Sequence, residues 1–507
     1  MSLYRSWPAL LAPLVISCSG GGCGLSPSPA GFPADERYAN AVQVRLTDRG
    51  LDFIANHAAA FVGSDSSGQL AVPVPPRCEM EPKLCCDVPA EACQIIVDLA
   101  ARDGDPPRMV LDPKDPPGNR LEVTLRARIR TPSPLPISAY GLTCDITFDT
   151  ELAGEKSITI MTALGFVEDA TAGTTRIETA DTTVADLDPG DITISGGPLE
   201  ACSYANWDSA KQTILDALKQ QITDQVASAV EEQLCKTCTT AGECAPFATC
   251  NAEGICVESE GQCLMELGVS GRLLASSLFA SLSPGQAGAM DVYDVAGGPG
   301  RTNAGGLSLA MLGGAVPADG RHDPCVPQRA PPSPPTGGIA PSDAFTANER
   351  PTDGVPFDLG IGLHAYHLNR NAWAAYDAGL LCLNVGTRSV PTIDSNTFGL
   401  LTPSMSALLH GENAQIVIAF RPTQAPTIAL GKGTTTDDGQ IDDPLLRLSF
   451  TSLEADVYAQ VEQRFVRLYT IRLDIDLPLN LEVDGEGQLV PVLGDLAAGI
   501  QHVEVTH

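Results

Sequence analysis

Basic residues are scarce in this chain of 507 residues, in which 31 Lys and Arg stand against 62 Asp and Glu and give a formal net charge of −31. A surface this acidic repels the phosphate backbones of nucleic acids and the anionic headgroups of membranes. We therefore expect no nucleic-acid partner.

Long apolar runs are also lacking. After the first 17 residues, no segment has the 18 or more consecutive apolar residues typical of a membrane-spanning helix. Hydrophobic residues make up 43% of the chain and charged residues only 18%, a balance that favours globular cores over disorder. The 48 Gly and 40 Pro favour strands and turns, and the length suffices for about three to five structural units.

The N-terminus has the pattern of an export signal. One cation, Arg5, precedes an apolar run that ends at Ile16 and is too short to span a bilayer. The next residues complete the motif Val15-Ile16-Ser17-Cys18, which resembles the lipobox of bacterial lipoproteins, where the cysteine is lipidated and becomes the mature N-terminus. We expect a signal peptide over 1–17 and lipidation of Cys18. The alternative is an ordinary secretory signal with incidental cysteines.

Residues 18–38 are rich in Gly, Ser and Pro, which predicts a flexible tether between the anchor and the first domain. The predicted location is the cell envelope. We expect an outer-membrane-anchored lipoprotein, and the sequence leaves open whether it faces the periplasm or the exterior.

Sixteen cysteines agree with export, because disulfides persist in oxidising compartments. Setting aside Cys18 and Cys23 leaves an even number, which falls into a cluster at 78–93, two distant couples and a run of six. We expect disulfides among the couples and the run: Cys144, Cys202, Cys325, Cys382, Cys235, Cys238, Cys244, Cys250, Cys256 and Cys263.

Zinc is the rival explanation for the run of six, since Cys235 and Cys238 form a CxxC motif. The later spacings offer no second CxxC and no His, which suits a tetrahedral zinc site poorly. We favour a small disulfide-stapled module over 235–263. Its connectivity stays open, because six cysteines allow fifteen pairings.

Hydrophobic periodicity predicts strands with two helices in the first half of the chain. Residues 42–47 alternate apolar and polar, and the period then changes to that of a helix over 51–62. Residues 121–130 alternate again and predict a half-buried strand. The strongest helical pattern covers 207–234, where apolar residues recur on one face.

The second half repeats this order after a Pro-rich segment within 324–356. Residues 359–365 alternate before a short helix at 369–377, and the end of the chain alternates strongly over 446–450 and 471–483. Two halves with the same opening indicate a duplicated, two-lobed β architecture.

This order of elements resembles the bactericidal/permeability-increasing protein and lipid-transfer protein family, also called tubular lipid-binding proteins. The likeness covers roughly residues 39–495, and its order of elements is more specific than any one motif. The local likenesses are the segments 44–52, the Cys144 and Cys202 couple followed by Trp207 and the long helix, 357–363 running to 376–381, and 422–431 before the final strands.

The resemblance implies an α+β, strand-dominated fold of two antiparallel β-barrels, each sealed by helices, joined by a central sheet and holding acyl chains in apolar pockets. It also implies a bond between Cys144 and Cys202. The expected parts are an N-terminal lipid-binding barrel at 39–234, the disulfide-rich insertion at 235–263, central strands and a Pro-rich linker at 264–356, and a C-terminal barrel at 357–507. The last long helix and closing strand of the family are expected to be missing after residue 496.

The family members that capture lipopolysaccharide carry a cationic tip, which a chain at −31 is not expected to have. The function implied by the resemblance is therefore to bind or transfer a lipid with acyl chains. Candidate pocket residues lie on the apolar faces of the two predicted helices: Leu51, Ile54, Phe61, Leu218, Ile222 and Val226. The alternative is that these side chains simply fill the barrel core.

A second hypothesis is a surface adhesion or interaction protein that acts through its Cys-rich module, with a partner that the sequence does not identify. No pattern indicates an enzyme, a metal site or a cofactor. His364 and His367 are the closest histidine pair, but on a strand their spacing would place them on opposite faces.

The lipobox makes a direct prediction. Because one acyl chain binds membranes only marginally, stable anchoring depends on the several chains of a lipidated cysteine. Cys18→Ala should therefore move the protein from the membrane fraction into the soluble exported fraction, as measured by immunoblotting. Membrane retention equal to that of the unaltered chain would refute the lipobox interpretation.

Overall fold

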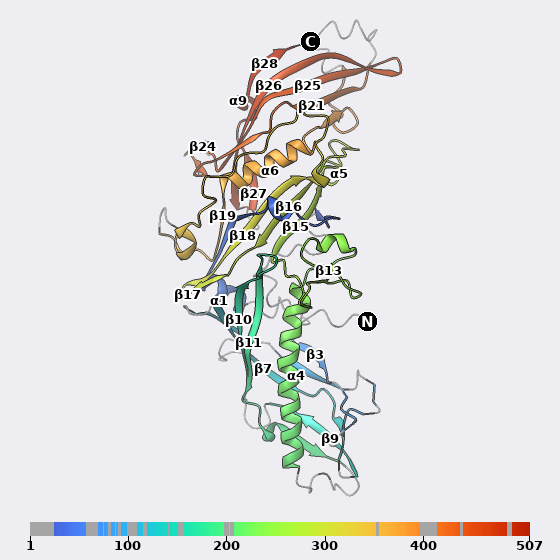
Figure 1. Ribbon diagram of the computed structural model, residues 1–507, viewed down its shortest axis with the longest axis vertical. Helices are drawn as coiled ribbons and strands as arrows, with labels where there is room; N and C mark the ends of the chain where they lie inside the picture. Colours follow the sequence, from blue (N-terminus) through green and yellow to red (C-terminus); the bar gives the residue numbers. More distant parts are fainter. Residues whose placement is uncertain are drawn as a thin grey trace.

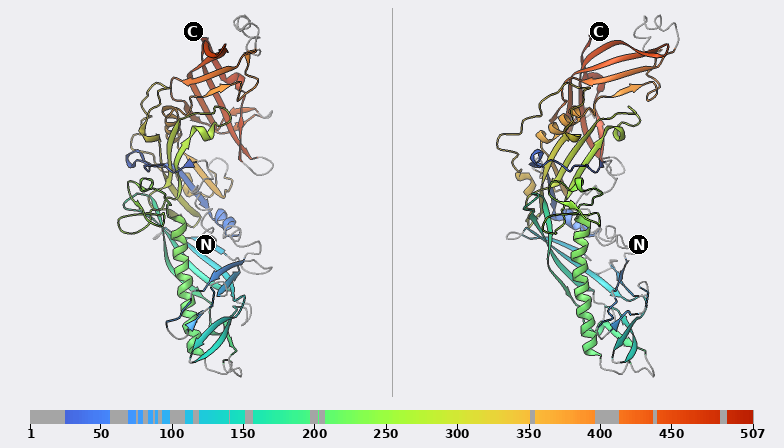
Figure 2. Two further views of the ribbon diagram at one scale, coloured as in Figure 1. Left: turned by 90° about the vertical axis from the view of Figure 1, so that its right-hand side faces the viewer. Right: turned by 45° about the vertical axis from the view of Figure 1, so that its right-hand side comes forward.

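The computed structural model describes residues 25–506, with gaps at 57–68, 75, 80–82, 87, 90–92, 99–108, 115–118, 140, 151–156, 197–201, 203–206, 351–353, 396–412, 437–439 and 484–488. The molecule is elongated, and three parts follow one another along its long axis (Figure 1). An N-terminal lobe with one long helix lies at the lower end, a central sheet in the middle, and a C-terminal sheet at the upper end. The views in Figure 2 show the same order.

Two antiparallel sheets form the N-terminal lobe. The larger has the order β11-β10-β7-β5-β3, with β6 also pairing with β7. Its strands are β3 (Gln69–Pro73), β5 (Gln94–Asp98), β6 (Met109–Pro113), β7 (Arg120–Arg130), β10 (Ile158–Glu168) and β11 (Thr175–Ala185). The smaller has the order β12-β9-β8-β4. Its strands are β4 (Lys83–Leu84), β8 (Leu135–Ala139), β9 (Leu142–Phe148) and β12 (Ile192–Ser195).

The predicted alternation of residues 121–130 is confirmed in β7. Leu121, Leu125 and Ile129 are buried, while the intervening Glu122 and Arg126 are not. This strand lies between β10 on one side and β5 and β6 on the other, so its apolar side chains lie in the main core of the lobe.

Two helices contribute to this core. Helix α4 (Asp208–Leu234) matches the predicted helix and runs along the lobe (Figure 1). It begins where Trp207 donates a hydrogen bond from Nε1 to the carbonyl of Cys202 at 2.6 Å. Helix α1 (Asp48–Asn56) starts three residues before the predicted 51–62 helix and ends at Asn56, and the rest of that range lies outside the described residues.

Gly50 explains why α1 can begin directly after its strand. A Cβ at this position would lie 2.2 Å from the carbonyl oxygen of Asp358, so only glycine permits this approach. Thr47 adds a cap, because its hydroxyl accepts a hydrogen bond from the Gly50 amide at 3.3 Å.

The central sheet has the order β1-β15-β16-β18-β2-β19, with β17 also pairing with β18. Its strands are β1 (Leu25–Ser26), β2 (Tyr38–Thr47), β15 (Gly268–Leu274), β16 (Ala289–Ala296), β17 (Arg301–Asn303), β18 (Gly306–Pro317) and β19 (Leu359–Leu363). It therefore joins segments from the beginning, middle and second half of the chain, as expected for a central sheet. A short helix, α5 (Ala275–Leu278), follows β15.

The flexible tether predicted for 18–38 is wrong for the described part, 25–38. Strand β1 pairs with β15, Phe32 is only 4% exposed and stacks on Tyr293, and Arg37 lies over the rings of Tyr293 and Phe247 at 4.1 and 4.8 Å. These aromatic and cation–π contacts fix a segment whose Gly, Ser and Pro content alone favours flexibility.

Disulfides are confirmed throughout the described chain. The module at 235–263 contains Cys235–Cys263, Cys238–Cys250 and Cys244–Cys256 around the hairpin of β13 (Thr249–Cys250) and β14 (Cys256–Val257). The distant couples bond as Cys144–Cys202 and Cys325–Cys382. The cluster at 78–93 forms Cys78–Cys86 and Cys85–Cys93.

The C-terminal sheet has the order β20-β21-β25-β26-β27, with β22 also pairing with β25 and β28 with β26. Its strands are β20 (Asn384–Gly386), β21 (Ile416–Pro422), β22 (Thr427–Leu430), β25 (Leu446–Val461), β26 (Arg464–Val483), β27 (Leu489–Leu493) and β28 (Ile500–Val505). A small hairpin, β23 (Thr434–Thr435) with β24 (Ile441–Asp443), and a short helix, α9 (Leu496–Gly499), complete this part. After residue 496, where the last long helix and closing strand of the family are expected to be missing, the structure has the short helix α9 and the six-residue strand β28, which pairs with β26.

Helix α6 (Ala365–Asp377) begins four residues earlier than the predicted helix at 369–377. His364 caps it through a hydrogen bond from the Tyr366 amide to Nδ1 at 3.0 Å. The segment holding His364 and His367 is therefore a helix start and not a strand. The two histidines still do not face one site, because His367 is buried against Tyr38 and Asp294.

The fold is strand-dominated α+β with curled sheets, as predicted at that level. Helix α6 packs its Trp373 and Ala374 against Ala315 and Met290 of the central sheet. Asn369 joins it to the C-terminal sheet, because its side-chain amide donates to the carbonyl of Ile428 in β22 and accepts from the Ile428 amide. This helix therefore belongs mainly to the central sheet.

A buried ion cluster joins the Cys-rich module to the N-terminal lobe. Arg176 on β11 contacts Asp169 and, at 3.1 Å, Glu258 of the module, and all three side chains are at most 10% exposed. Arg176 also donates to the carbonyl of Cys263 at 3.2 Å. Burial, followed by the hydrogen bond and charge of Asp169, raises the pKa of Glu258 to about 7.

This pKa predicts a pH dependence. Since the Glu258 pKa is raised above its unfolded value of about 4.3, the folded state holds an extra proton between the two values. Stability should therefore fall as pH rises from about 4.3 to about 7, and level off above that range. Asp169 stays ionised there, because Arg176 and the Thr171 and Ala172 amides lower its pKa more than burial raises it.

Glu258→Gln should flatten this dependence, because the amide keeps the neutral form at every pH. The melting temperature, measured by calorimetry at pH 5, 6, 7 and 8, reports the effect. In a unit of 150–250 residues, a loss of 1 kcal/mol lowers it by about 2–4 °C. The matched control is Glu260→Gln, an exposed carboxylate of the same module, which should retain the slope of the original chain. Equal slopes for both variants would show that Glu258 does not titrate in this range.

Candidate functional site

The two faces of the C-terminal sheet differ sharply in chemistry. Residues paired directly across neighbouring strands share a face, so the register assigns each side chain to one of them. One row runs across four strands as Leu430, Leu446, Leu479 and Leu493. Neighbouring rows on the same face are Ile428, Leu448 and Leu477, then Phe450, Ile475 and Ile500.

We call this surface the apolar face and define it by Ile428, Leu430, Leu446, Leu448, Phe450, Ile475, Leu477, Leu479, Leu481, Leu493 and Ile500. None of these side chains is fully buried. Leu430, Leu481, Leu493 and Ile500 are 41–54% exposed, and the others are half-buried. Continuous apolar surfaces are uncommon on folded proteins in water, so this face is the candidate binding surface of the described residues.

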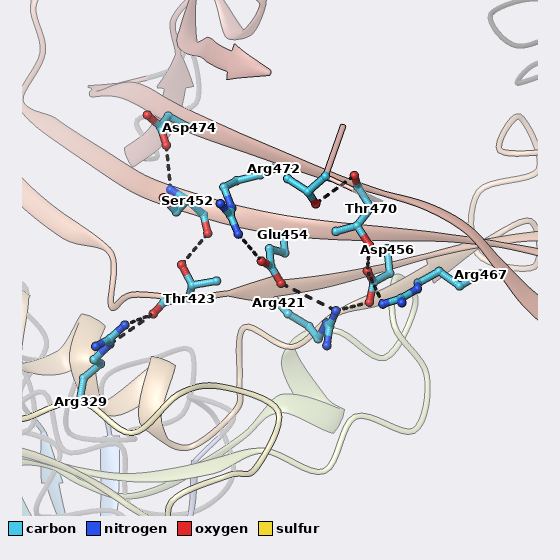
Figure 3. Close-up of polar contacts among 11 residues, drawn as sticks. Arg329, Arg421, Thr423, Ser452, Glu454, Asp456, Arg467, Thr470, Arg472 and Asp474 are labelled. Atoms are coloured by element: carbon cyan, nitrogen blue, oxygen red, sulfur yellow. Dashed lines mark hydrogen bonds and ion pairs between the residues drawn. The ribbon is translucent and has the colours of Figure 1, made fainter. Parts of the chain in front are cut away.

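The opposite face carries paired charges. Arg421, Glu454 and Arg472 form ion pairs, with Glu454 lying 3.0 Å from Arg472 and 3.8 Å from Arg421 (Figure 3). Asp456 is only 1% exposed and accepts from Thr470 and Arg421. The charges therefore compensate one another across neighbouring strands.

The same face continues in both directions from this network. Asp474 accepts from the Ser452 amide at 2.7 Å (Figure 3). It also contacts His502 at 2.8 Å, and these two interactions lower the pKa of Asp474. Further along, Asp476 lies 3.5 Å from Arg447. Apart from the buried Asp456, these charged side chains are partly exposed to solvent, which leaves the apolar face as the unusual feature of this sheet.

A smaller apolar stripe lies on the edge strand of the central sheet. Leu359, Ile361 and Leu363 of β19 are 46–53% exposed and point to one face because they alternate along the strand. Leu363 directly precedes the His364 cap of α6, so this stripe ends where the chain turns toward the C-terminal part.

The pocket residues predicted from the sequence lie elsewhere. Leu51, Ile54 and Ile222 are at most 7% exposed and belong to the core cluster of the N-terminal lobe, and Leu218 is half-buried against that cluster. Their packing is that of a hydrophobic core, and contact with lipid stays a prediction.

Three further candidates are outside what the structure describes. Phe61 and Cys18 fall in undescribed segments, and Val226 lies in α4 but its side chain is not described. The lipidation of Cys18 therefore stays a prediction as well.

Two groups of potential metal ligands occur among the described residues. They are Cys238, Cys244 and Cys250, and Asp323, Cys325 and Cys382. All five cysteines are engaged in disulfides, so they offer no thiolate to a metal ion.

Sequence reasoning missed the apolar face although its signal was present. Residues 471–483 alternate perfectly in apolar character, which predicts a strand with one apolar surface. Alternation alone does not reveal whether another element covers that surface. The packing of α6 in the structure is needed to decide whether a helix covers this face.

No helix in the described part of the chain is long and apolar enough to cross a membrane.

No protein-family model and no curated protein matches this chain. Among solved structures, the chain is similar to lipopolysaccharide binding protein at 11% identity and a TM-score of 0.34, covering 92% of this chain and 85% of that one. It is also similar to P47 of Clostridium botulinum E1, at 7% identity and a TM-score of 0.20, covering 93% and 83% of the two chains. At TM-scores this low, these likenesses define neither a family nor a ligand for the chain.

Proposed function

We propose that this protein binds or transfers a lipid, and that the lipid's acyl chains lie on the apolar face of the C-terminal sheet. The observation that carries the proposal is the face itself, where apolar side chains from five strands remain accessible while the opposite face is charged and paired. The family resemblance of the sequence points to the same class of ligand.

Burial of an acyl chain on the apolar face can supply the free energy of binding without any polar contact. Burial recovers about 0.8 kcal/mol per CH₂, so a chain of 16 carbons can gain on the order of 12 kcal/mol before binding costs. Transfer of a lipid needs no bond to be made or broken, and the proposal therefore includes no catalytic step.

An acyl chain fits this face better than a folded protein partner does. Protein interfaces usually carry about one hydrogen bond per 100–200 Å². The side chains that define the apolar face offer no hydrogen-bond donor or acceptor. A hydrocarbon chain requires none.

The Cys-rich module is better explained as a structural part than as a free-standing adhesion unit. Its Glu258 is buried with Arg176 of the N-terminal lobe, and its Phe247 contacts Arg37 of the N-terminal segment. Through these contacts the module packs against two other parts of the molecule. This favours a structural role for the module, and therefore the lipid-binding hypothesis over the adhesion hypothesis.

Anchoring through Cys18 is part of the same proposal, with the cell envelope as the location. Leu25 lies seven residue steps after Cys18, and an extended chain of that length reaches at most about 25 Å. Leu25 pairs with the central sheet, so the anchor would hold the middle of the molecule close to the membrane.

Two adjacent residues of β22 provide a matched test. Leu430 lies on the apolar face, whereas Ala429 pairs with Arg447 on the opposite face, and both are exposed. Leu430→Asp should weaken the binding of a fluorescent long-chain fatty acid about tenfold, because burying one leucine contributes about 1.5–3 kcal/mol. Ala429→Asp adds the same charge and should leave the affinity unchanged.

Thermal melting of both variants shows whether the sheet stays folded. Equal affinities for the two variants would place the ligand elsewhere in the molecule, and no saturable binding by the unaltered chain would contradict the proposed function.

A further inference from the structure

A separate cavity of about 600 Å³ lies against the central sheet where several distant segments meet. Its lining includes Arg37 from the N-terminal segment, Thr171 from the turn between β10 and β11, Phe247 from the Cys-rich module, Arg301 from β17 and Phe345 from the linking segment. The volume falls within the usual range of small-molecule sites, about 300–1,000 Å³.

The charge of this cavity is opposite to that of the chain. Two arginines, Arg37 and Arg301, and one carboxylate, Glu168, line it. In the whole sequence, acidic residues outnumber Lys and Arg by 62 to 31. The acidic residues repel anions from most of the remaining surface. This cavity, with its excess of cations, therefore favours anionic ligands.

Neither lining arginine forms an ion pair with a carboxylate of the described residues. Arg301 is exposed and makes no ion pair within the described part of the chain. Arg37 lies between the rings of Tyr293 and Phe247, and it donates one hydrogen bond, to the carbonyl of Phe32 at 3.1 Å. Its Nε and Nη1 atoms are buried without a hydrogen-bond partner.

A third arginine lies behind the wall of the cavity. Arg45 is 1% exposed and donates to three neutral oxygens, those of Ser308, Asn303 and Asn348, at 3.2, 2.7 and 2.8 Å. Ser308 lines the cavity. Burial lowers the pKa of the Arg45 guanidinium, partly offset by the charge of Asp48, but an arginine stays protonated at neutral pH. Its positive charge therefore reaches the cavity.

The rest of the lining suits a molecule with an apolar part. Leu309 and Leu312 of β18 line the cavity beside the aromatic rings of Phe247 and Phe345. Guanidinium groups bind phosphate oxygens through paired hydrogen bonds, and apolar walls favour the carbon skeleton attached to the phosphate.

We propose that this cavity binds the phosphate group of a small phosphate ester, either soluble or part of a lipid headgroup. The site is independent of the apolar face of the C-terminal sheet, which holds no charged side chain. It uses Arg301 as the phosphate-binding group, with Arg37 and Arg45 supplying positive charge from the wall behind it.

Isothermal titration of the purified full-length chain with three probes tests the proposal. The probes are glycerol 3-phosphate, dihexanoyl phosphatidic acid and the zwitterionic dihexanoyl phosphatidylcholine. Saturable binding of at least one of the first two is expected. It should weaken as NaCl is raised from about 50 to 500 mM, because salt screens the interaction.

Arg301→Gln should weaken this binding about tenfold, the usual effect of losing a charge-assisted hydrogen bond. This arginine is exposed, so the change should leave folding intact. The matched control is Arg464→Gln, an exposed arginine that begins β26 and does not line the cavity, and it should bind like the original chain.

The probes separate the two sources of phosphate. Similar affinities for glycerol 3-phosphate and phosphatidic acid would indicate a soluble ester, and binding of phosphatidic acid alone would indicate a lipid headgroup. Leu430→Asp distinguishes this site from the apolar face and should leave glycerol 3-phosphate binding unchanged. Absence of binding by both anions, equal binding of phosphatidylcholine, or equal affinities for the Arg301 and Arg464 variants would overturn the proposal.

Discussion

The strand period of two residues, combined with the position of one helix, determines the exposed surface of this molecule. Alternation along β22, β25, β26 and β27 places leucine and isoleucine on one face of the C-terminal sheet, and along β25 and β26 it places charged residues on the other. Helix α6 could have covered the apolar face, but its Trp373 and Ala374 pack on the central sheet. The apolar face therefore stays partly accessible, and the proposed lipid binding depends on that accessibility.

Much of the fold could be predicted from periodicity and from cysteine spacing. The long helix ends at Leu234 as its pattern indicates, and β7 shows the predicted alternation. The N-terminal segment could not be predicted, because its order depends on the contacts of Phe32 and Arg37 with residues more than 200 positions away. Helical periodicity predicts the candidate pocket residues, but it does not distinguish a packed core from a cavity that holds a ligand.

The Cys-rich module links the parts that lie around it. Its disulfides form a compact unit, while Glu258 joins it to Arg176 and Phe247 joins it to Arg37. The module also contributes Phe247 to the cationic cavity. The module, which the sequence suggests as a separate adhesion unit, therefore contacts the N-terminal lobe and the N-terminal segment and lines the cavity against the central sheet.

Lipid extraction followed by mass spectrometry tests the central claim most directly. The Cys18→Ala chain is used because it cannot carry lipid attached to Cys18. It is incubated with vesicles of bacterial phospholipids and then separated from them. The account predicts acyl lipid bound non-covalently in an amount close to one molecule per chain. Recovery of folded protein without bound lipid would contradict it.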